Sequence, residues 1–165
     1  MRLFIAIDFD DGMRRALQDV QEDMRSAGLQ GRFSPVENLH LTLAFIGEYN
    51  YPDEILDIID GIPFELTDIR LDRMGRFDDL YWVGIADNPE LLKYVKRLRR
   101  ELSDHGIPFD RKKFSPHITV LRKAQYRRDR KFPGILVPEI AMEADHASLF
   151  RSDRCKNGMI YTELT

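Results

Sequence analysis

The sequence contains very little cysteine and no long apolar run, and each absence excludes a class of protein. The single Cys155 can form neither an intramolecular disulfide nor a cluster of thiolate metal ligands, so we expect a cytoplasmic protein. No apolar stretch approaches the roughly 20 residues of a membrane helix, and we expect no membrane partner. Residues 1–8 meet a charge at Asp8, too early for the apolar region of a signal peptide, and they predict a strand instead.

A glycine-rich phosphate loop and a linker between domains are also absent. The 165 residues are 43% hydrophobic and 32% charged, a composition typical of a globular domain with its own core. We therefore expect a single two-lobed domain over residues 1–165. Its halves are expected at roughly 1–85 and 86–165, and the lobes can exchange terminal strands.

Hydrophobic periodicity predicts a mixture of helices and strands. Helical spacing of apolar residues runs from Met13 to a stop at Gly28, and again from Pro52 to near Gly61. Asn88 and Pro89 predict the start of a third helix, which Gly106 ends. Strands are expected at 2–8, 38–46, 64–72, 80–86, 116–121, 147–151 and 159–164, with a basic loop at 123–138. This mixture predicts the α+β or the α/β class.

Acidic and basic residues are unevenly distributed along the chain. The formal net charge of −3 argues against strong general affinity for nucleic acid. Residues 111–131, however, hold nine Lys/Arg and one Asp, a net charge of +8, whereas the remaining 16 basic and 27 acidic residues give −11. A local basic patch on an acidic body suits a ligand that carries phosphate, although a solvated basic loop has the same composition.

Two short segments of the chain resemble each other. Residues 39–43 (LHLTL) and 116–120 (PHITV) both contain His, an apolar residue, Thr and another apolar residue. His40 and His117 are 77 residues apart, about half the chain, which suggests two similar lobes. In a strand, His and Thr of each segment share one face, about 6.5–7 Å apart, and the apolar residues point to the other.

This set of side chains suits chemistry on a phosphate ester. An imidazole can act as an acid or a base near neutral pH. In-line displacement at phosphorus requires a base for the incoming water and an acid for the leaving oxygen, on opposite sides. Histidines from two facing lobes could occupy these positions, with Thr hydroxyls donating hydrogen bonds to the phosphate oxygens.

The other two histidines and a metal site are the alternatives. His105 and His146 are expected to be surface or edge histidines, although His146 is also followed by a hydroxyl residue, Ser148. A metal site usually needs three or four ligands, and no Asp, Glu or Cys lies within three residues of His117. We therefore expect no metal and no other cofactor.

Around these motifs the sequence resembles the two-histidine phosphoesterase superfamily, and more closely the RNA 2′,3′-cyclic phosphodiesterases, also called 2′-5′ RNA ligases. The matching stretches are MRLFIAID, ENLHLTLAFIGE, YWVGI, FSPHITVLR, ASLFRS and GMIYTEL, which together span nearly the whole chain. The resemblance implies an α+β, two-lobed, pseudo-symmetric fold in which two mainly antiparallel sheets line a central cleft, with helices outside. It implies a hydrolase that opens 2′,3′-cyclic phosphate ends of RNA to 2′-phosphates, with minor reversible 2′-5′ ligation.

The resemblance also implies roles for individual residues. His40 would protonate the leaving 3′ oxygen, and His117 would deprotonate the attacking water. Thr42 and Thr119 would hold phosphate oxygens, and Arg122 matches a basic residue just past the second motif. The expected partner is RNA with a cyclic phosphate end or a related nucleotide, bound by a monomer.

Strand alternation raises a question about Arg122 and about three aromatic residues. Strict alternation places Arg122 opposite His117, so Arg122 reaches the cleft only where the strand ends or bulges near Leu121. Phe45 and Phe114 could stack on a base. Because Phe45 shares the parity of the apolar residues in its strand, core packing is predicted for it, and for Trp82 as well.

Two other functions remain open. The same two-histidine chemistry could act on a small cyclic-phosphate nucleotide, which differs from RNA in the pocket it needs. A non-catalytic RNA-binding module is the third possibility, but binding alone would not need two titratable imidazoles.

Overall fold

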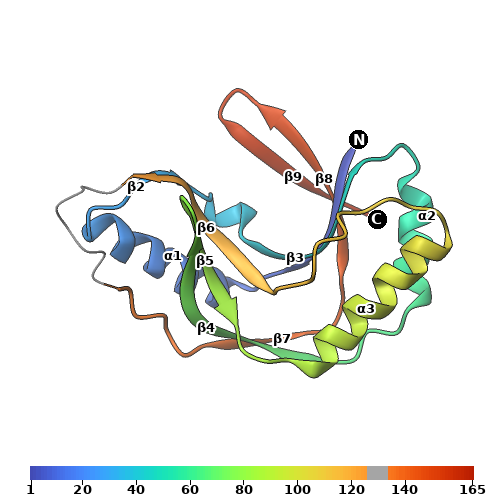
Figure 1. Cartoon of the computed structure of the whole chain (residues 1–165), viewed down its shortest axis with the longest axis horizontal. Coiled ribbons are helices and arrows are strands. Elements are labelled where there is room, and N and C mark those ends of the chain that lie inside the picture. The colour runs from blue at the N-terminus through green and yellow to red at the C-terminus, as the bar shows by residue number, and fades with distance from the viewer. Residues whose placement is uncertain (126–133) are drawn as a thin grey trace.

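The computed structural model describes residues 1–125 and 134–165. Three helices and nine strands are present in this part of the chain (Figure 1). In chain order the elements are β1 (Arg2–Asp8), α1 (Asp11–Ser26), β2 (Gln30–Phe33), a 3-10 turn (Val36–Asn38), β3 (His40–Glu48), α2 (Pro52–Gly61), β4 (Thr67–Phe77), β5 (Leu80–Ile85), α3 (Pro89–Asp104), β6 (His117–Gln125), β7 (Ala141–Ala144), β8 (Ser148–Cys155) and β9 (Gly158–Leu164).

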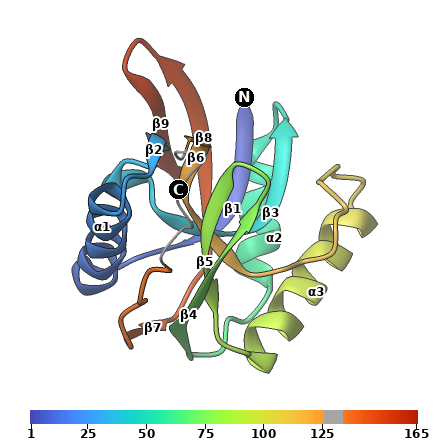
Figure 2. The same ribbon diagram turned by 60° about the vertical axis from the view of Figure 1, so that its left-hand side comes forward.

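The strands form two antiparallel sheets, which confirms the predicted α+β class. One sheet has the order β3-β1-β8-β9 and the other β2-β6-β5-β4-β7. Each sheet takes strands from both halves of the chain. Helix α1 lies beside the five-stranded sheet, α2 and α3 lie beside the four-stranded sheet, and the β8–β9 hairpin projects from the body (Figures 1 and 2).

Side-chain caps begin helices α1 and α3, and the cap of α3 is the Asn88 that the sequence predicted. The Asp10 carboxylate accepts a hydrogen bond from the Met13 amide at 2.8 Å, and the Asn88 side chain accepts one from the Leu91 amide at 3.0 Å. Each contact satisfies an N–H that the first helical turn would otherwise leave unpaired. Beyond α1, Gly28 has a φ of 99°, a left-handed conformation that glycine adopts without strain.

Two short strands were not predicted from the sequence. Strands β2 and β7 have four residues each and form the two edges of the five-stranded sheet. Segments this short give little periodicity to detect. Strand β6 also runs on to Gln125, so the predicted loop over 123–138 begins too early, and residues 126–133 lie outside the described part of the chain.

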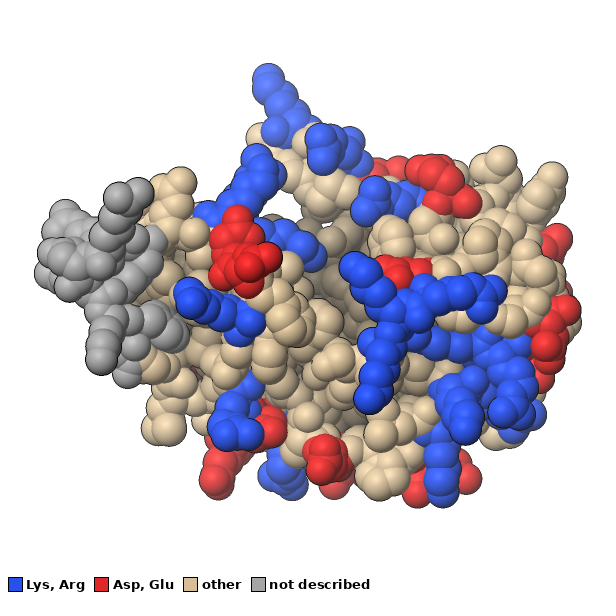
Figure 3. Space-filling view, viewed as in Figure 1, with Lys and Arg blue, Asp and Glu red and all other residues tan. Residues whose placement is uncertain are grey.

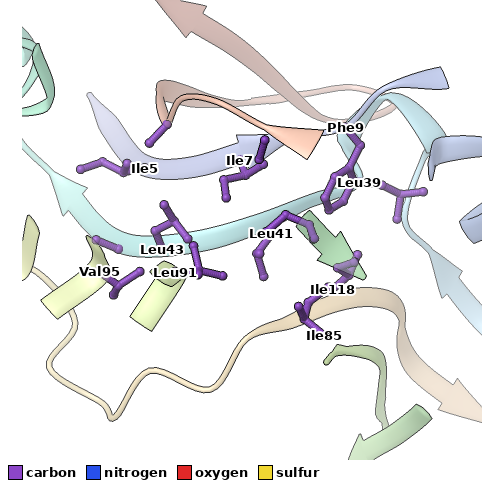
Figure 4. Close-up of a cluster of buried hydrophobic side chains, with 14 of the residues drawn as sticks. Ile5, Ile7, Phe9, Leu39, Leu41, Leu43, Ile85, Leu91, Val95 and Ile118 are labelled. Carbon is purple, nitrogen blue, oxygen red and sulfur yellow. The ribbon is translucent and has the colours of Figure 1, made fainter. Parts of the chain in front are cut away.

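Buried leucines fix the orientation of strand β3. Leu39, Leu41 and Leu43 are at most 1% exposed, and Leu41 and Leu43 point toward α3 and Ile118 of β6 (Figure 4). Burying one such side chain stabilises the fold by about 1.5–3 kcal/mol. A slip of one residue would reverse the faces of the whole strand, so the core holds His40 and Thr42 on the opposite face.

No helix in the described residues is long and apolar enough to span a bilayer.

Candidate active site

A cavity of about 1430 Å³ lies between the two sheets. It is lined by all five predicted site residues, namely His40, Thr42, His117, Thr119 and Arg122. Strand β3 provides the first two and β6 the other three. The space-filling view shows the molecule hollowed below the β8–β9 hairpin, with basic side chains around the hollow (Figure 3).

Each motif strand carries a β-bulge at the same distance from its histidine. Ile5 and Ala6 of β1 pair with Ala44 and Thr42, which leaves Leu43 as an extra residue of β3. A bulge of this kind shifts the alternation of faces by one residue. Leu43 and Ala44 are consequently both buried, and the residue after them returns to the cavity face.

Strand β6 repeats this arrangement and brings Arg122 into the cavity. Tyr81 and Trp82 of β5 pair with Leu121 and Thr119, so Val120 is the extra residue. Val120 and Leu121 are both buried. Arg122 therefore shares the face of Thr119. The bulge near Leu121 that the sequence analysis required for Arg122 to reach the cleft is present.

The same physics corrects the prediction for Phe45. Strict alternation placed it in the main core, but the bulge at Leu43 turns it to the cavity face. There its partly buried ring lines the cavity and packs against a small cluster of Phe4, Ala6 and Phe150. Phe114 lines the cavity as well. Trp82 lies outside the lining, half-buried, with its ring centroid 6.3 Å from that of His117.

Backbone carbonyl groups fix the tautomers of both motif histidines. The Nδ1 atom of His40 lies 2.6 Å from the carbonyl oxygen of Asn38, and that of His117 lies 2.6 Å from the carbonyl oxygen of Ser115. A carbonyl oxygen only accepts, so Nδ1 carries hydrogen in each neutral ring. Nε2 is left for proton exchange in both histidines, and in His40 it lies 2.8 Å from the Thr42 hydroxyl oxygen.

The surroundings of His40 favour its neutral form. Its ring packs against Phe4 and Tyr161, at centroid distances of 4.8 and 5.4 Å. Burial lowers the pKa of His40 below its usual 6.5, and the nearby charge of Arg122 lowers it further. The Asn38 carbonyl and the Asp8 carboxylate act in the opposite direction without cancelling these effects.

The remaining histidines lie away from the cavity. His105 Nδ1 is 2.8 Å from the Glu101 carbonyl oxygen at the end of α3, and His146 pairs with its neighbour Asp145. Neither lines the cavity. Over residues 1–125 and 134–165, no group of three or more His, Cys, Asp or Glu side chains is placed to hold a metal ion.

The cavity lining is strongly basic. Among the described residues that line it, Asp110 is the one acidic residue and eight are cations, namely Arg25, Arg32, Arg99, Lys112, Lys113, Arg122, Arg154 and Lys156. Lys112, Lys113 and Arg122 belong to the basic segment predicted from the sequence, whereas its members between 127 and 131 lie outside the described residues. The sequence did not predict Arg154, at the end of β8, or Lys156, in the turn of the β8–β9 hairpin, and both come to the cavity only through the fold.

Known proteins share both the sequence and the fold. The family model described as LigT like Phosphoesterase matches residues 7–80 and 83–161. An RNA 2′,3′-cyclic phosphodiesterase of Methanothermobacter thermautotrophicus is 31% identical over 182 residues, covering 99% of this chain and 96% of that protein. One of the same name from Thermotoga maritima is 29% identical, covering 99% and 93%. The crystal structure of E. coli LigT with 3′-AMP superposes with a TM-score of 0.83 at 26% identity, covering 99% of this chain and 95% of that one. As its paired motifs predicted, this chain belongs to the LigT-like phosphoesterase family and is a hydrolase of the phosphodiesterase type.

Proposed function

We propose that this protein hydrolyses 2′,3′-cyclic phosphate ends of RNA to 2′-phosphomonoesters, using His40 and His117 as acid and base and no metal ion. The observation that carries the proposal is the pair of imidazoles on one cavity, each with Nδ1 held by a backbone carbonyl and Nε2 left for proton exchange. Both relatives described above bear the name RNA 2′,3′-cyclic phosphodiesterase, and E. coli LigT has been crystallised with 3′-AMP and with phosphate.

The proposed step transfers one proton on each side of the phosphorus. His117 Nε2 accepts a proton from water as the water oxygen forms a bond to phosphorus. The bond from phosphorus to the 3′ oxygen breaks, and that oxygen takes a proton from His40 Nε2. The product carries a 2′-phosphate and a free 3′-hydroxyl, and solvent restores both imidazoles. Run in reverse, the same pair would support minor 2′-5′ joining.

The phosphate itself would be held by Thr42, Thr119 and Arg122. Hydroxyl groups donate to the non-bridging oxygens, and a guanidinium can donate two parallel hydrogen bonds. Arg122 also has an electrostatic effect, because its charge lowers the pKa of His40 in the free protein. An anionic phosphate beside Arg122 would offset that charge, so the substrate helps to protonate the acid that its own leaving group needs.

The charge of the cavity favours RNA over a single cyclic nucleotide. Its eight cations extend from the motif strands to the β8–β9 hairpin and to Lys112 and Lys113 before β6, more than one phosphate can contact. We propose a monomer acting in the cytoplasm on such RNA ends.

One assay tests the proposal. A short RNA ending in a 2′,3′-cyclic phosphate is incubated in excess chelator with wild type, His40→Ala, His117→Ala and the control His105→Ala, which lies outside the cavity. We expect the 2′-phosphate isomer, with losses of about 10²–10⁴-fold in the two motif variants alone. Turnover abolished by chelator would contradict metal independence. A wild type that opens only a cyclic mononucleotide would overturn the choice of RNA.

A further inference from the structure

At the two bulges, two carbonyl groups accept hydrogen bonds from side chains of the helices. These belong to Leu43 in β3 and Val120 in β6, extra residues of the two motif strands. A buried carbonyl oxygen needs a hydrogen-bond donor, and a donor from a helix couples the bulge to another part of the fold. The donors identify which parts of the protein hold the bulges in place.

Helix α1 provides a side-chain donor for Val120. Gln21 is a polar residue of that helix and only 2% exposed. Its Nε2 donates to the Val120 carbonyl oxygen at 3.0 Å and to the Ser34 carbonyl oxygen at 2.8 Å. Ser34 lies in the segment that leads into His40, and its own amide donates to the Val120 carbonyl at 3.0 Å. One amide side chain thus ties the bulge beside His117 to the approach to His40.

Helix α3 provides the donor for Leu43 through Arg99. The guanidinium donates to the Leu43 carbonyl oxygen through Nε at 3.3 Å and Nη2 at 3.2 Å. Its Nη1 donates to the Lys112 carbonyl oxygen at 2.7 Å. Lys112 lies in the segment that leads into His117, where the Asp110 amide also donates to the Phe45 carbonyl at 2.8 Å. Arg99 thus ties the bulge beside His40 to the approach to His117.

Gln21 and Arg99 therefore occupy equivalent places in a crossed arrangement. Each comes from a helix, holds the bulge of one motif strand and fixes the segment before the opposite histidine. We infer that Gln21 and Arg99 are positioning residues, an inference that rests on the proposed function. Gln21 keeps Arg122 on the cavity face, and Arg99 keeps Phe45 there. Together they hold the spacing of the two histidines.

A double-mutant cycle tests the role of Gln21 through Arg122. Gln21→Met keeps the length of the side chain and removes its donor, and Gln18→Met is the control on the exposed face of the same helix. We expect kcat/KM to fall about tenfold in the wild-type background, as for one lost buried hydrogen bond. The loss should be smaller in an Arg122→Met background, where only the effect on the spacing of the histidines remains. Equal losses in both backgrounds would overturn the inference for Gln21.

Arg99 is tested with its charge preserved. Arg99→Lys retains the cation but cannot make all three guanidinium contacts, and Arg100→Lys is the control at an exposed site of α3. We expect Arg99→Lys to lower kcat/KM about tenfold and to lose most of that effect in a Phe45→Leu background. A variant as active as the wild type would mean that Arg99 contributes charge alone.

A readout without catalysis separates this inference from the proposed function. Gln21→Met should accelerate exchange of the Ser34 amide proton about tenfold, and Arg99→Lys that of the Asp110 amide, while core amides of β1 stay protected. Unchanged exchange at both amides would overturn the inference even if the enzyme is active. Faster exchange in a protein that does not open cyclic phosphates would support the positioning roles of Gln21 and Arg99 and contradict the proposed substrate.

Discussion

Phe45 and Arg122 occupy matching positions on the two motif strands: each lies five residues after the histidine of its strand and lines the cavity. A bulge of the same kind brings each of them there, but one side chain is an aromatic ring and the other a cation. The two halves of the cavity are thus alike in backbone and different in chemistry. This difference suits a substrate with a base on one side and a phosphate on the other.

The pair predicts two separable losses of affinity. Arg122→Met should weaken binding of both inorganic phosphate and a nucleoside 2′-phosphate by about 10- to 100-fold, since charged hydrogen bonds contribute about 1.5–3 kcal/mol. Phe45→Leu should weaken the nucleotide alone, because base stacking contributes about 1–3 kcal/mol and inorganic phosphate has no base. Titration calorimetry with both ligands checks this, and an equal effect of Phe45→Leu on both would count against stacking.

The hydroxyl of Thr42 should matter for the reaction more than for the fold. It lies 2.8 Å from His40 Nε2 and lines the cavity. Thr42→Val keeps the shape and removes the hydroxyl, so we expect kcat to fall about tenfold or more with the melting temperature nearly unchanged. Thr42→Ser retains the hydroxyl and should recover most of the activity. A valine variant with wild-type kcat would remove Thr42 from the site.

The sequence predicted the faces of the motif strands up to the bulges and no further. Alternation correctly placed His40, Thr42, His117 and Thr119 together, because buried leucines and isoleucines fix the register. It placed Phe45 in the core because the bulge at Leu43 is a feature of how β3 pairs with β1, and Leu43 contacts Arg99, 56 residues away, which no local pattern reveals. Strand pairing and long-range side-chain contacts set the rest of the site, and those are properties of the fold.

Gly75 in β4 leaves room for the ring of Trp82. A Cβ atom on Gly75 would lie 2.2 Å from Cζ2 of that ring, which also packs beside Phe77 and His117. Gly75→Ala should therefore reduce the free energy of unfolding by about 1–3 kcal/mol and lower activity through His117. Gly61→Ala is the matched control, with no atom within 4 Å of the added carbon. Urea unfolding and kcat/KM of both variants check the two effects, and a Gly75→Ala variant with wild-type kcat/KM would show that the contact does not constrain His117.

The basic rim of the cavity should act on long substrates. Lys112, Lys113, Arg154 and Lys156 line it away from the motif strands. Replacing all four with Gln should raise KM for an RNA oligonucleotide far more than for a cyclic mononucleotide, and flatten the salt dependence by about 0.7 in log–log slope per lost phosphate contact. A control variant loses the same charge from α3, through Gln at Lys93, Lys96, Arg97 and Arg100, which lie outside the lining. Equal effects of the two variants would show that the overall charge of the protein, and not the rim, determines KM for RNA.

The lowered pKa of His40 predicts how activity depends on pH. Burial is the main cause and Arg122 adds to it. A proton donor works only while protonated, so activity falls as the pH rises through its pKa. The profile of kcat/KM reports the free enzyme, in which the pKa of His40 lies below 6.5, whereas that of kcat reports the complex, in which the anionic phosphate favours the imidazolium.

The alkaline limb of kcat/KM should therefore lie at a lower pH than the alkaline limb of kcat. In Arg122→Met the first limb should move to higher pH, because one cause of the lowered pKa is gone, but burial should keep it below its usual position. Profiles measured from pH 4.5 to 9 with the wild type and this variant check both statements. Coincident limbs, or an alkaline limb that survives in His40→Ala, would show that His40 is not the proton donor and would give that role to His117.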